Sequence, residues 1–356
     1  MGTADAEVQI RREGALGHIH LQRPKALNAL THGMILAVSQ ALATWKDDPE
    51  VVAVMVTGEG ERAFCAGGDV HEVCRLAQRQ GVDAAAPFFF DEYRMNWRIK
   101  RFPKPYVALL DGVTMGGGVG ISVHGSHRIA TERTAFAMPE TLIGMFPDVG
   151  GTFVLSRMAD GVGQWLALAG TRLGPVDSLA AGVATHFIPA AAAGTLIGEL
   201  GRVRNAAEVD EVVAGLAGSV EGVSEIERHR DAIAAVFTQP GLDEVAAAAA
   251  VEPSGWGREQ WTAVLSRSPT SVKLAFAQLA RGRELDFEDC MRLEYRMVRR
   301  VLAGRDFFEG VRALLVDRDN QPRWRPAALE AVDDASIDAH FAPLDGGDLP
   351  LDWVPA

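Results

Sequence analysis

The sequence predicts an α/β protein with a layered core, followed by an all-α region. Up to about residue 205, short apolar runs, glycine-rich turns and amphipathic helical patterns alternate, which is typical of layered α/β folds. Beyond that point strand-like runs disappear, alanine becomes abundant, and helical periodicity continues to about residue 341. We therefore expect two regions, residues 1–205 and residues 206–356.

The first elements are expected to be a hairpin and a helix. Residues 8–11 and 18–21 alternate apolar with polar side chains around a Glu-Gly turn, which predicts two antiparallel strands. Thr31 precedes apolar residues at helical spacing up to Trp45, and threonine is a favoured N-cap residue. The pattern therefore predicts a helix that begins after Thr31.

Later apolar runs predict further strands. Residues 51–57 and 106–110 are almost continuously apolar, as expected of strands that are covered on both faces. Residues 127–130 and 134–137 form a third pattern. The tail from residue 344, rich in proline and glycine, predicts irregular structure.

Composition and charge exclude several classes of protein. The chain has 356 residues, of which 48% are hydrophobic and 23% charged, an ordinary balance for a globular protein. A formal charge of −12 disfavours a nucleic-acid surface, and the apolar runs are too short to span a bilayer. The N-terminus does not resemble a secretory signal, and three cysteines without metal-ligand spacing suit a reducing cytosol. We expect a cytoplasmic protein with no metal, nucleic-acid or membrane partner.

Two glycine-rich turns, about fifty residues apart, each end an apolar run. Gly67-Gly68 ends the first and Gly116 to Gly118 ends the second. Glycine lets a ligand approach the backbone, and two converging N–H groups can stabilise the oxyanion of an acyl group. Each turn also has a purely structural alternative. The first could simply reverse the chain, and the glycines of the second could allow a helix to pack closely against a strand.

Two carboxylates follow the second turn in an apolar setting. Glu140 and Asp148 lie in the segment Met-Pro-Glu-Thr-Leu-Ile-Gly-Met-Phe-Pro-Asp-Val-Gly-Gly, where a solvated surface charge is not expected. Each is a candidate for acid, base or nucleophilic chemistry. Alternatively, Glu140 could cap neighbouring amides, and Asp148 could be the N-cap of a helix over residues 152–158.

These stretches resemble the crotonase superfamily of enoyl-CoA hydratases and isomerases, and within it the branch of 3-hydroxyisobutyryl-CoA hydrolases. The matching runs are residues 63–70, 104–125, 137–151 and 182–187, together with 268–273, 294–296 and 306–313 in the second half. The resemblance implies a spiral of ββα units followed by a helical region that often mediates trimer contacts. It therefore implies a homo-oligomer as well.

The resemblance also implies roles for individual residues. Gly68 and Gly117 occupy the two oxyanion-hole positions, and Glu140 matches the catalytic carboxylate. Hydratases carry a second catalytic glutamate where this chain has Gly120, and a small residue where it has Asp148. Both departures are shared with the hydrolases.

Three further sets of residues complete the expected site. Glu92 matches a third acidic residue of the hydrolase branch, although the residues alone predict a surface position. The roles of His124 and His186, which lie inside matching motifs, stay open. By resemblance, coenzyme A is part of the substrate, no other cofactor is needed, and its binding residues are Arg23, Lys25, Ala26, Leu27, Ala66, Gly67, Gly68 and Asp69.

We expect an enzyme that hydrolyses a short-chain 3-hydroxyacyl-CoA thioester, with 3-hydroxyisobutyryl-CoA of valine breakdown as the first candidate. Glu140 would act as nucleophile or general base, and Asp148 would bind the 3-hydroxyl group and orient the substrate, alongside Glu92 and Gly117. One alternative is an enoyl-CoA hydratase or isomerase that uses Glu140. Another is a non-catalytic acyl-CoA-binding protein.

Overall fold

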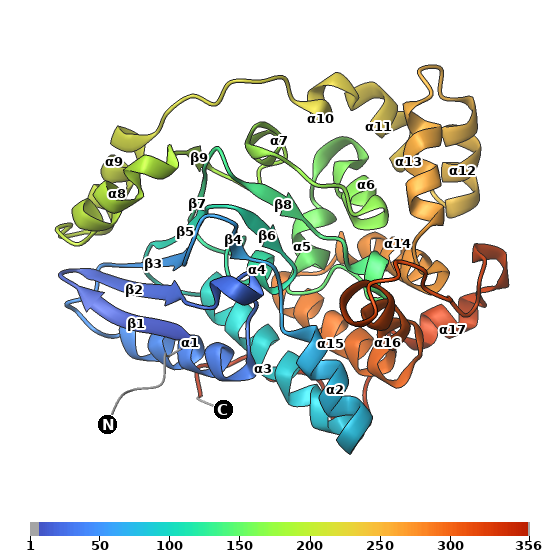
Figure 1. The fold of residues 1–356 in the computed structure, drawn as a ribbon, viewed down its shortest axis with the longest axis horizontal. Coiled ribbons are helices and arrows are strands. Elements are labelled where there is room, and N and C mark those ends of the chain that lie inside the picture. Colours follow the sequence, from blue (N-terminus) through green and yellow to red (C-terminus); the bar gives the residue numbers. More distant parts are fainter. Residues whose placement is uncertain (1–6, 355–356) are drawn as a thin grey trace.

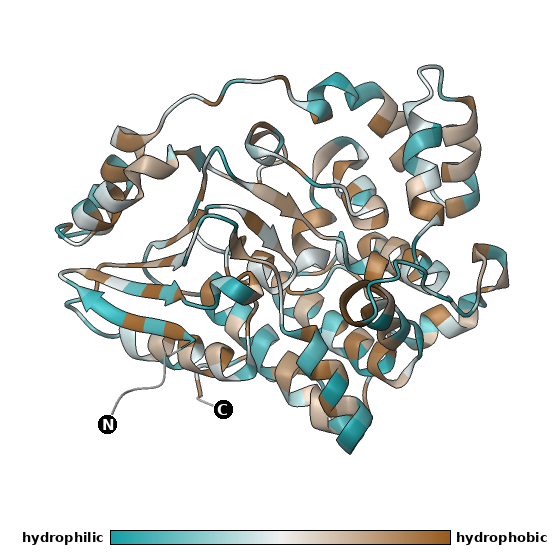
Figure 2. Ribbon diagram, in the orientation of Figure 1, coloured by the Kyte–Doolittle hydropathy of each residue, from teal (hydrophilic) through white to brown (hydrophobic). Residues whose placement is uncertain are grey.

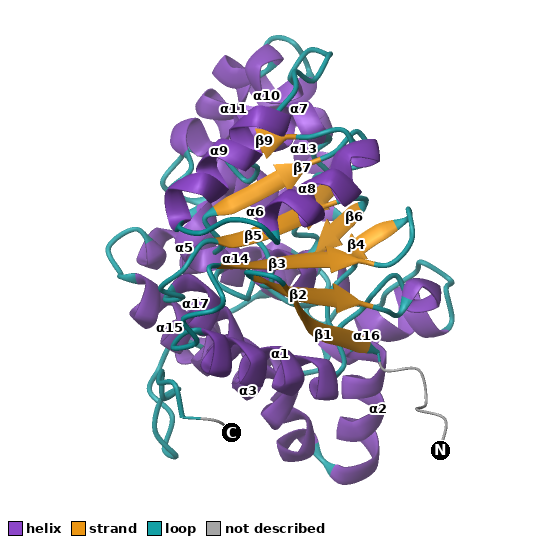
Figure 3. Ribbon diagram, turned by 90° about the vertical axis from the view of Figure 1, so that its left-hand side faces the viewer, coloured by secondary structure: helices purple, strands orange, loops and turns teal. Residues whose placement is uncertain are grey.

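Two mainly parallel sheets form the centre of the computed structural model, which describes residues 7–354 (Figure 1). The strands are β1 (Val8–Glu13), β2 (Leu16–Leu21), β3 (Ala53–Gly58), β4 (Ala63–Cys65), β5 (Tyr106–Leu110), β6 (Val113–Met115), β7 (His127–Ala130), β8 (Ala135–Ala137) and β9 (His186–Phe187). The larger sheet has the order β1-β2-β3-β5-β7-β9, and the smaller one the order β4-β6-β8. Figure 3 shows the larger sheet as a stack of strands with the smaller sheet at its side.

The predicted hairpin is confirmed, and its strands open the larger sheet. β1 and β2 pair antiparallel with Val8 opposite Leu21, and all later pairs in both sheets are parallel. The hydropathy colouring alternates along β1 (Figure 2), as expected of an edge strand with one solvated face. β3 and β5, by contrast, are almost wholly buried, which matches their continuously apolar sequences.

Helices surround the sheets. The first part of the chain contains η1 (Pro24–Ala26), α1 (His32–Trp45), α2 (Val70–Gln80), α3 (Val82–Lys100), α4 (Gly117–Gly120), η2 (Glu140–Ile143), α5 (Gly151–Leu155), η3 (Ala159–Gly161), α6 (Val162–Ala169), α7 (Pro175–Ala180), η4 (Ala190–Ala192) and α8 (Ala193–Leu200). The Thr31 hydroxyl accepts a hydrogen bond from the amide of Met34, so the predicted N-cap of α1 is confirmed.

After β9, all assigned elements of the described chain are helices. After η4 and α8, they are α9 (Ala206–Leu216), α10 (Glu225–Arg228), α11 (Arg230–Phe237), α12 (Leu242–Val251), α13 (Trp256–Leu265), α14 (Pro269–Gly282), α15 (Phe287–Ala303), α16 (Asp306–Val311), η5 (Arg312–Val316), η6 (Leu329–Ala331) and α17 (Asp334–Ala339). The outer ends of the two predicted regions, residues 1–6 and 355–356, lie outside the described residues.

One apolar core joins both parts of the chain. It includes Ile19 of β2 and Tyr93 of α3 together with Leu274 of α14, Phe287 of α15 and Phe307 of α16. α15 packs along α3, and α14 packs against α5 and α6 (Figure 1). The late helices therefore pack against helices of the first part of the chain, two of which, α5 and α6, follow β8.

A second, smaller core covers the other face of the larger sheet. There Met55 and Val107 pack with Leu196 and Leu200 of α8 and Val213 of α9. No helix within residues 7–354 is both long enough and apolar enough to cross a membrane.

Candidate active site

A cavity of about 590 Å³ lies at the carboxyl ends of the three strands in the smaller sheet. Gly68 follows β4, Gly117 follows β6 and Glu140 follows β8, and all three line this cavity. Because the three strands are parallel neighbours, their carboxyl ends lie at the same edge. The smaller sheet therefore brings together residues that are far apart in the sequence.

The two glycine turns lie against each other. A Cβ atom at Gly117 would lie 3.1 Å from the amide nitrogen of Gly68. The Leu30 amide donates to Gly67 O, and the Asp69 amide donates to Leu30 O, each at 2.8 Å. These bonds leave the intervening Gly68 amide on the opposite side of the chain, facing the second turn.

Neither amide has an acceptor. The Gly117 amide belongs to the first turn of α4, where helical N–H groups lack an internal partner. Across residues 7–354, no carbonyl or side chain accepts a hydrogen bond from the amide of Gly68 or of Gly117. Two adjacent free donors form the geometry of an oxyanion hole.

The close approach of the turns requires glycine at two positions. Gly67 has a φ of +128° and Gly116 a φ of +47°, and side chains rarely adopt such a conformation. A Cβ atom at Gly116 would also lie 3.3 Å from the Cα atom of Gly67. The glycines therefore do more than reverse the chain.

Glu140 begins η2 and presents a buried, unpaired carboxylate to the cavity. Neither of its oxygens has a hydrogen-bond partner among the described residues, and Oε1 lies 3.7 Å from the Cβ position of Gly116. Burial, followed by the nearby Asp148 charge, raises the pKa of Glu140 well above its usual range. The capping interpretation of Glu140 is therefore wrong.

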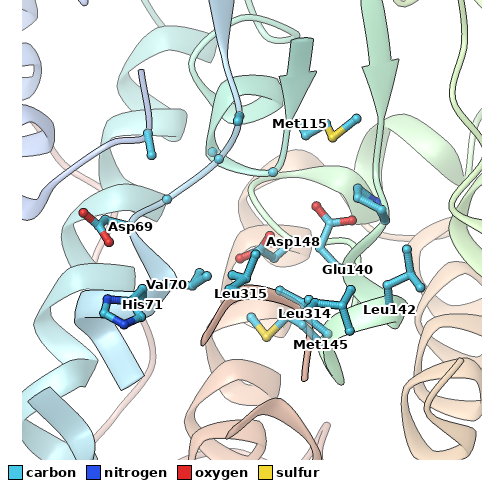
Figure 4. Close-up of a pocket in the computed structure, with 18 of the residues that line it drawn as sticks. Asp69, Val70, His71, Met115, Glu140, Leu142, Met145, Asp148, Leu314 and Leu315 are labelled. Carbon is cyan, nitrogen blue, oxygen red and sulfur yellow. The ribbon is translucent and has the colours of Figure 1, made fainter. Parts of the chain in front are cut away.

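Asp148 shares this cavity, as Figure 4 shows. Its Oδ2 accepts a 2.8 Å hydrogen bond from the Tyr93 hydroxyl. Burial raises the pKa of Asp148 to about 7, although the Tyr93 hydrogen bond acts in the opposite direction. The N-cap of α5 is Gly150, with no side-chain cap, so the expectation of Asp148 as a cap of a helix over residues 152–158 is wrong.

Glu92 lies in the cavity, and the surface position predicted from the residues alone is wrong. It is 2% exposed, and its Oε1 has no hydrogen-bond partner within residues 7–354. Burial and the Asp148 charge raise the pKa of Glu92 well above its usual range. The physical reason is that α3 runs between α1, α2 and α15, so the charged residues of its second half are covered.

Most of the expected coenzyme A residues line the cavity. Ala26, Leu27, Ala66, Gly67, Gly68 and Asp69 lie on its wall, whereas Arg23 and Lys25 are not among the lining residues. The Arg23 guanidinium donates to Asp69 Oδ2 at 3.0 Å and to Ala29 O at 2.6 Å. Lys25 is exposed. The role of these residues in binding coenzyme A stays a prediction.

Sequence reasoning missed the apolar side chains that shape the cavity. Phe88 and Phe89 come from α3, and Leu314 and Leu315, labelled in Figure 4, come from η5. Arg318 follows η5 and also lines the cavity. The only sequence signal for the residues after α16 is the matching motif over residues 306–313, and it ends just before Leu314.

The two histidines have different surroundings. His124 is buried, and its Nε2 lies 2.7 Å from Val149 O, next to Asp148. Burial lowers the pKa of His124 to about 3, so its neutral ring donates this hydrogen bond. His186 lies on β9 beside Thr185, outside the cavity. Within residues 7–354, no group of three His, Cys, Asp or Glu side chains is placed to hold a metal ion.

Relatives of known name match nearly the whole chain. The 3-hydroxyisobutyryl-CoA hydrolase, mitochondrial, of Gallus gallus is 42% identical over 97% of this chain and 91% of its own length. The protein of the same name from Homo sapiens is 39% identical over the same shares of the two chains.

Solved structures also match the fold over nearly the whole chain. One is described as a carnitinyl-CoA dehydratase from Mycobacterium thermoresistibile, with 39% identity, a TM-score of 0.89, and 96% of this chain and 98% of that chain covered. Another is described as an enoyl-CoA hydratase from Rhodobacter sphaeroides, with 38% identity, a TM-score of 0.88, and 97% and 100% covered. Residues 16–341 match the family described as Enoyl-CoA hydratase/isomerase. The chain therefore belongs to the enoyl-CoA hydratase/isomerase family.

Proposed function

We propose that the chain hydrolyses 3-hydroxyisobutyryl-CoA to 3-hydroxyisobutyrate and coenzyme A. The observation that carries the proposal is the unpaired, buried carboxylate of Glu140 beside the free amides of Gly68 and Gly117. Relatives named as hydrolases of this thioester, at about 40% identity over nearly the whole chain, support the choice of substrate.

The reaction follows from the placement of these groups. The thioester oxygen accepts hydrogen bonds from the amides of Gly68 and Gly117, which stabilise the negative charge that develops on it. Glu140 either attacks the carbonyl carbon, forming a mixed anhydride that water opens, or removes a proton from the attacking water. The carbon–sulfur bond breaks in either case, and the coenzyme A thiolate leaves.

Asp148 supplies recognition of the 3-hydroxyl group in this proposal. Tyr93 occupies Oδ2, which leaves Oδ1 to accept a hydrogen bond from the substrate. A bound substrate without the hydroxyl would cover this oxygen without pairing it, and such a loss discriminates strongly between substrates.

Hydration or isomerisation through Glu140 is the second candidate, since two similar solved structures are described as a dehydratase and a hydratase. The surroundings of Gly120 count against it. A Cβ atom there would lie 2.6 Å from Asn96 Nδ2 and 2.7 Å from Val149 Cβ. The site has no room for a glutamate at the position that carries one in the familiar hydratases.

A panel of acyl-CoA thioesters tests the proposal. Release of free coenzyme A, followed with a thiol reagent, is expected for 3-hydroxyisobutyryl-CoA and 3-hydroxypropionyl-CoA and much less for isobutyryl-CoA. Loss of the conjugated double bond of an enoyl-CoA without release of coenzyme A would instead support a hydratase. A chain that binds these thioesters but changes none of them would support the non-catalytic alternative.

Several expectations accompany the proposed activity. A role in valine degradation fits the named relatives, whose names also describe them as mitochondrial. A cytoplasmic location, activity without a cofactor beyond the coenzyme A of the substrate, and assembly as a homotrimer stay predictions.

A further inference from the structure

We propose that Glu294, on α15, is a positioning residue that holds Asp148 in its working place, and that it thereby sets the preference for 3-hydroxylated substrates. The inference rests on the proposed function, because it assigns a partner to the residue that recognises the 3-hydroxyl group. Glu294 does not line the cavity, but it binds the backbone that follows Asp148.

The Glu294 carboxylate binds the loop immediately after Asp148. Its Oε2 accepts a 2.7 Å hydrogen bond from the Gly150 amide, and its Oε1 accepts a 2.8 Å hydrogen bond from the Thr152 amide. The carboxylate is completely buried. Two hydrogen bonds to a side chain on one helix fix both the position and the orientation of this segment.

The loop has a strained backbone that needs such support. Val149, directly after Asp148, has a φ of +51°, a conformation that is a genuine outlier for a β-branched residue. Strain of this kind is unfavourable and persists only when the surroundings impose it. Because the strained residue adjoins Asp148, relaxation of the loop would displace the Asp148 carboxylate.

Two other side chains hold the same loop. The Gln278 amide of α14 donates to Pro147 O and to Thr152 Oγ1, each at 2.6 Å, and the His124 ring binds Val149 O. The bonds from Glu294, Gln278 and His124 thus flank Asp148 on both sides. Glu294 is the member that supplies two acceptors, so its loss leaves two buried amides unsatisfied.

The decisive variant is Glu294→Gln, which keeps the shape and one oxygen but turns an NH₂ group toward an amide donor. The matched control is Glu252→Gln. Glu252 is also a buried acceptor of backbone amides, those of Ser254 and Gly257 at the start of α13, each at 2.9 Å. In both variants an amide replaces a carboxylate that binds backbone N–H groups at the start of a neighbouring helix. Only the Glu294 carboxylate touches the Asp148 loop.

We expect Glu294→Gln to lower kcat at least about tenfold and to lower the rate ratio of 3-hydroxyisobutyryl-CoA to isobutyryl-CoA at least about fivefold. Inhibition by free coenzyme A should change less than about twofold. Glu252→Gln should keep both kcat and the ratio within about twofold of the wild type, whatever its melting temperature. Equal behaviour of the two variants would overturn the positioning role.

A double variant separates action through Asp148 from a general effect. If Glu294 acts through Asp148, Glu294→Gln should slow the Asp148→Asn enzyme less than about twofold, because the group it positions is already altered. Independent, multiplied losses would overturn the proposal. Should Glu294→Gln fail to fold, Gln278→Met, which removes the bond to Pro147 O while keeping the volume, should lower the same ratio.

The proposed function and the positioning role fail in different ways. A wild-type chain that releases no coenzyme A from 3-hydroxyisobutyryl-CoA overturns both. An active wild-type chain whose Glu294→Gln variant keeps its full rate and selectivity overturns the positioning role alone.

Discussion

The buried hydroxyl of Tyr93 donates a 2.8 Å hydrogen bond to the carboxylate of Asp148, which lines the cavity. The bond joins α3 to the loop before α5, and both residues are buried. It occupies one Asp148 oxygen and directs the other. The orientation of the residue that is proposed to bind the substrate hydroxyl therefore depends on a side chain more than fifty positions earlier.

Tyr93→Phe should lower the rate with 3-hydroxyisobutyryl-CoA about tenfold, since a hydrogen bond to a charged group contributes roughly 1.5–3 kcal/mol. The rate with isobutyryl-CoA should fall less. Tyr106→Phe is the matched control: the buried Tyr106 hydroxyl donates to Ile121 O at 2.9 Å and not to Asp148. Its removal should affect stability but not selectivity, and equal losses in the two variants would contradict the role of Tyr93.

Glu140→Gln should abolish turnover, with a loss of at least about a thousandfold in kcat, because the amide can neither attack nor accept a proton. Binding of free coenzyme A should stay nearly intact, since the amides and the apolar wall are unchanged. Steady-state assays and calorimetric titration measure the two effects. Substantial remaining turnover would assign the chemistry to another carboxylate.

The same variant should stabilise the fold at alkaline pH. Burial raises the pKa of Glu140 above its value in the unfolded chain, so stability is highest below the unfolded pKa and is lost as pH rises through the folded pKa. Glutamine removes this dependence. Thermal unfolding of Glu140→Gln should give a melting temperature roughly 1–3 °C above the wild type near pH 8, with a smaller difference near pH 5.

Asp148→Asn should shift the acidic limb of the pH–rate profile to lower pH. The Asp148 charge is the second cause, after burial, that raises the pKa of Glu140. Without this charge the pKa of Glu140 falls, so the reactive carboxylate forms at lower pH even though the maximal rate is reduced. Profiles of kcat/KM between about pH 5 and pH 9 report this shift; a limb that moves upward or not at all would argue against Glu140 as the titrating group.

Gly120→Ala should destabilise the protein by about 1–3 kcal/mol, because its Cβ would overlap Asn96 and Val149. Gly215→Ala in α9 is the matched control: no atom lies within 4 Å of its Cβ position, and alanine favours helices. Chemical denaturation should place the two variants on opposite sides of the wild type. An unchanged stability of Gly120→Ala would contradict the lack of room for a glutamate at this position, on which the case against a hydratase depends.

The local parts of the fold could be predicted because their signals are local. Alternation fixed the β1–β2 hairpin, and Thr31 marked the start of α1. The glycine turns and Glu140 were also found, since a turn beside an apolar strand and a charge inside an apolar stretch are visible in a short window. The pairing of β4, β6 and β8 in a separate sheet has no such local signal.

The rest of the site depends on contacts between distant segments. Glu92 has the sequence neighbours of a surface residue, and only the packing of α1, α2 and α15 around α3 buries it. Asp148 has the sequence of a helix cap, but Glu294 binds the amides that it would have capped. The spacing of residues along the chain does not show which of two carboxylates accepts the hydrogen bond from a given amide.

The bonds from α14 and α15 to the Asp148 loop also decide when the enzyme becomes complete. A growing chain presents Glu140 and Asp148 well before Gln278 and Glu294 have been synthesised. The loop therefore gains its final geometry only after α14 and α15 have been synthesised and have docked. Translation products that stop short of α15 would carry every reactive group of the site yet lack its geometry.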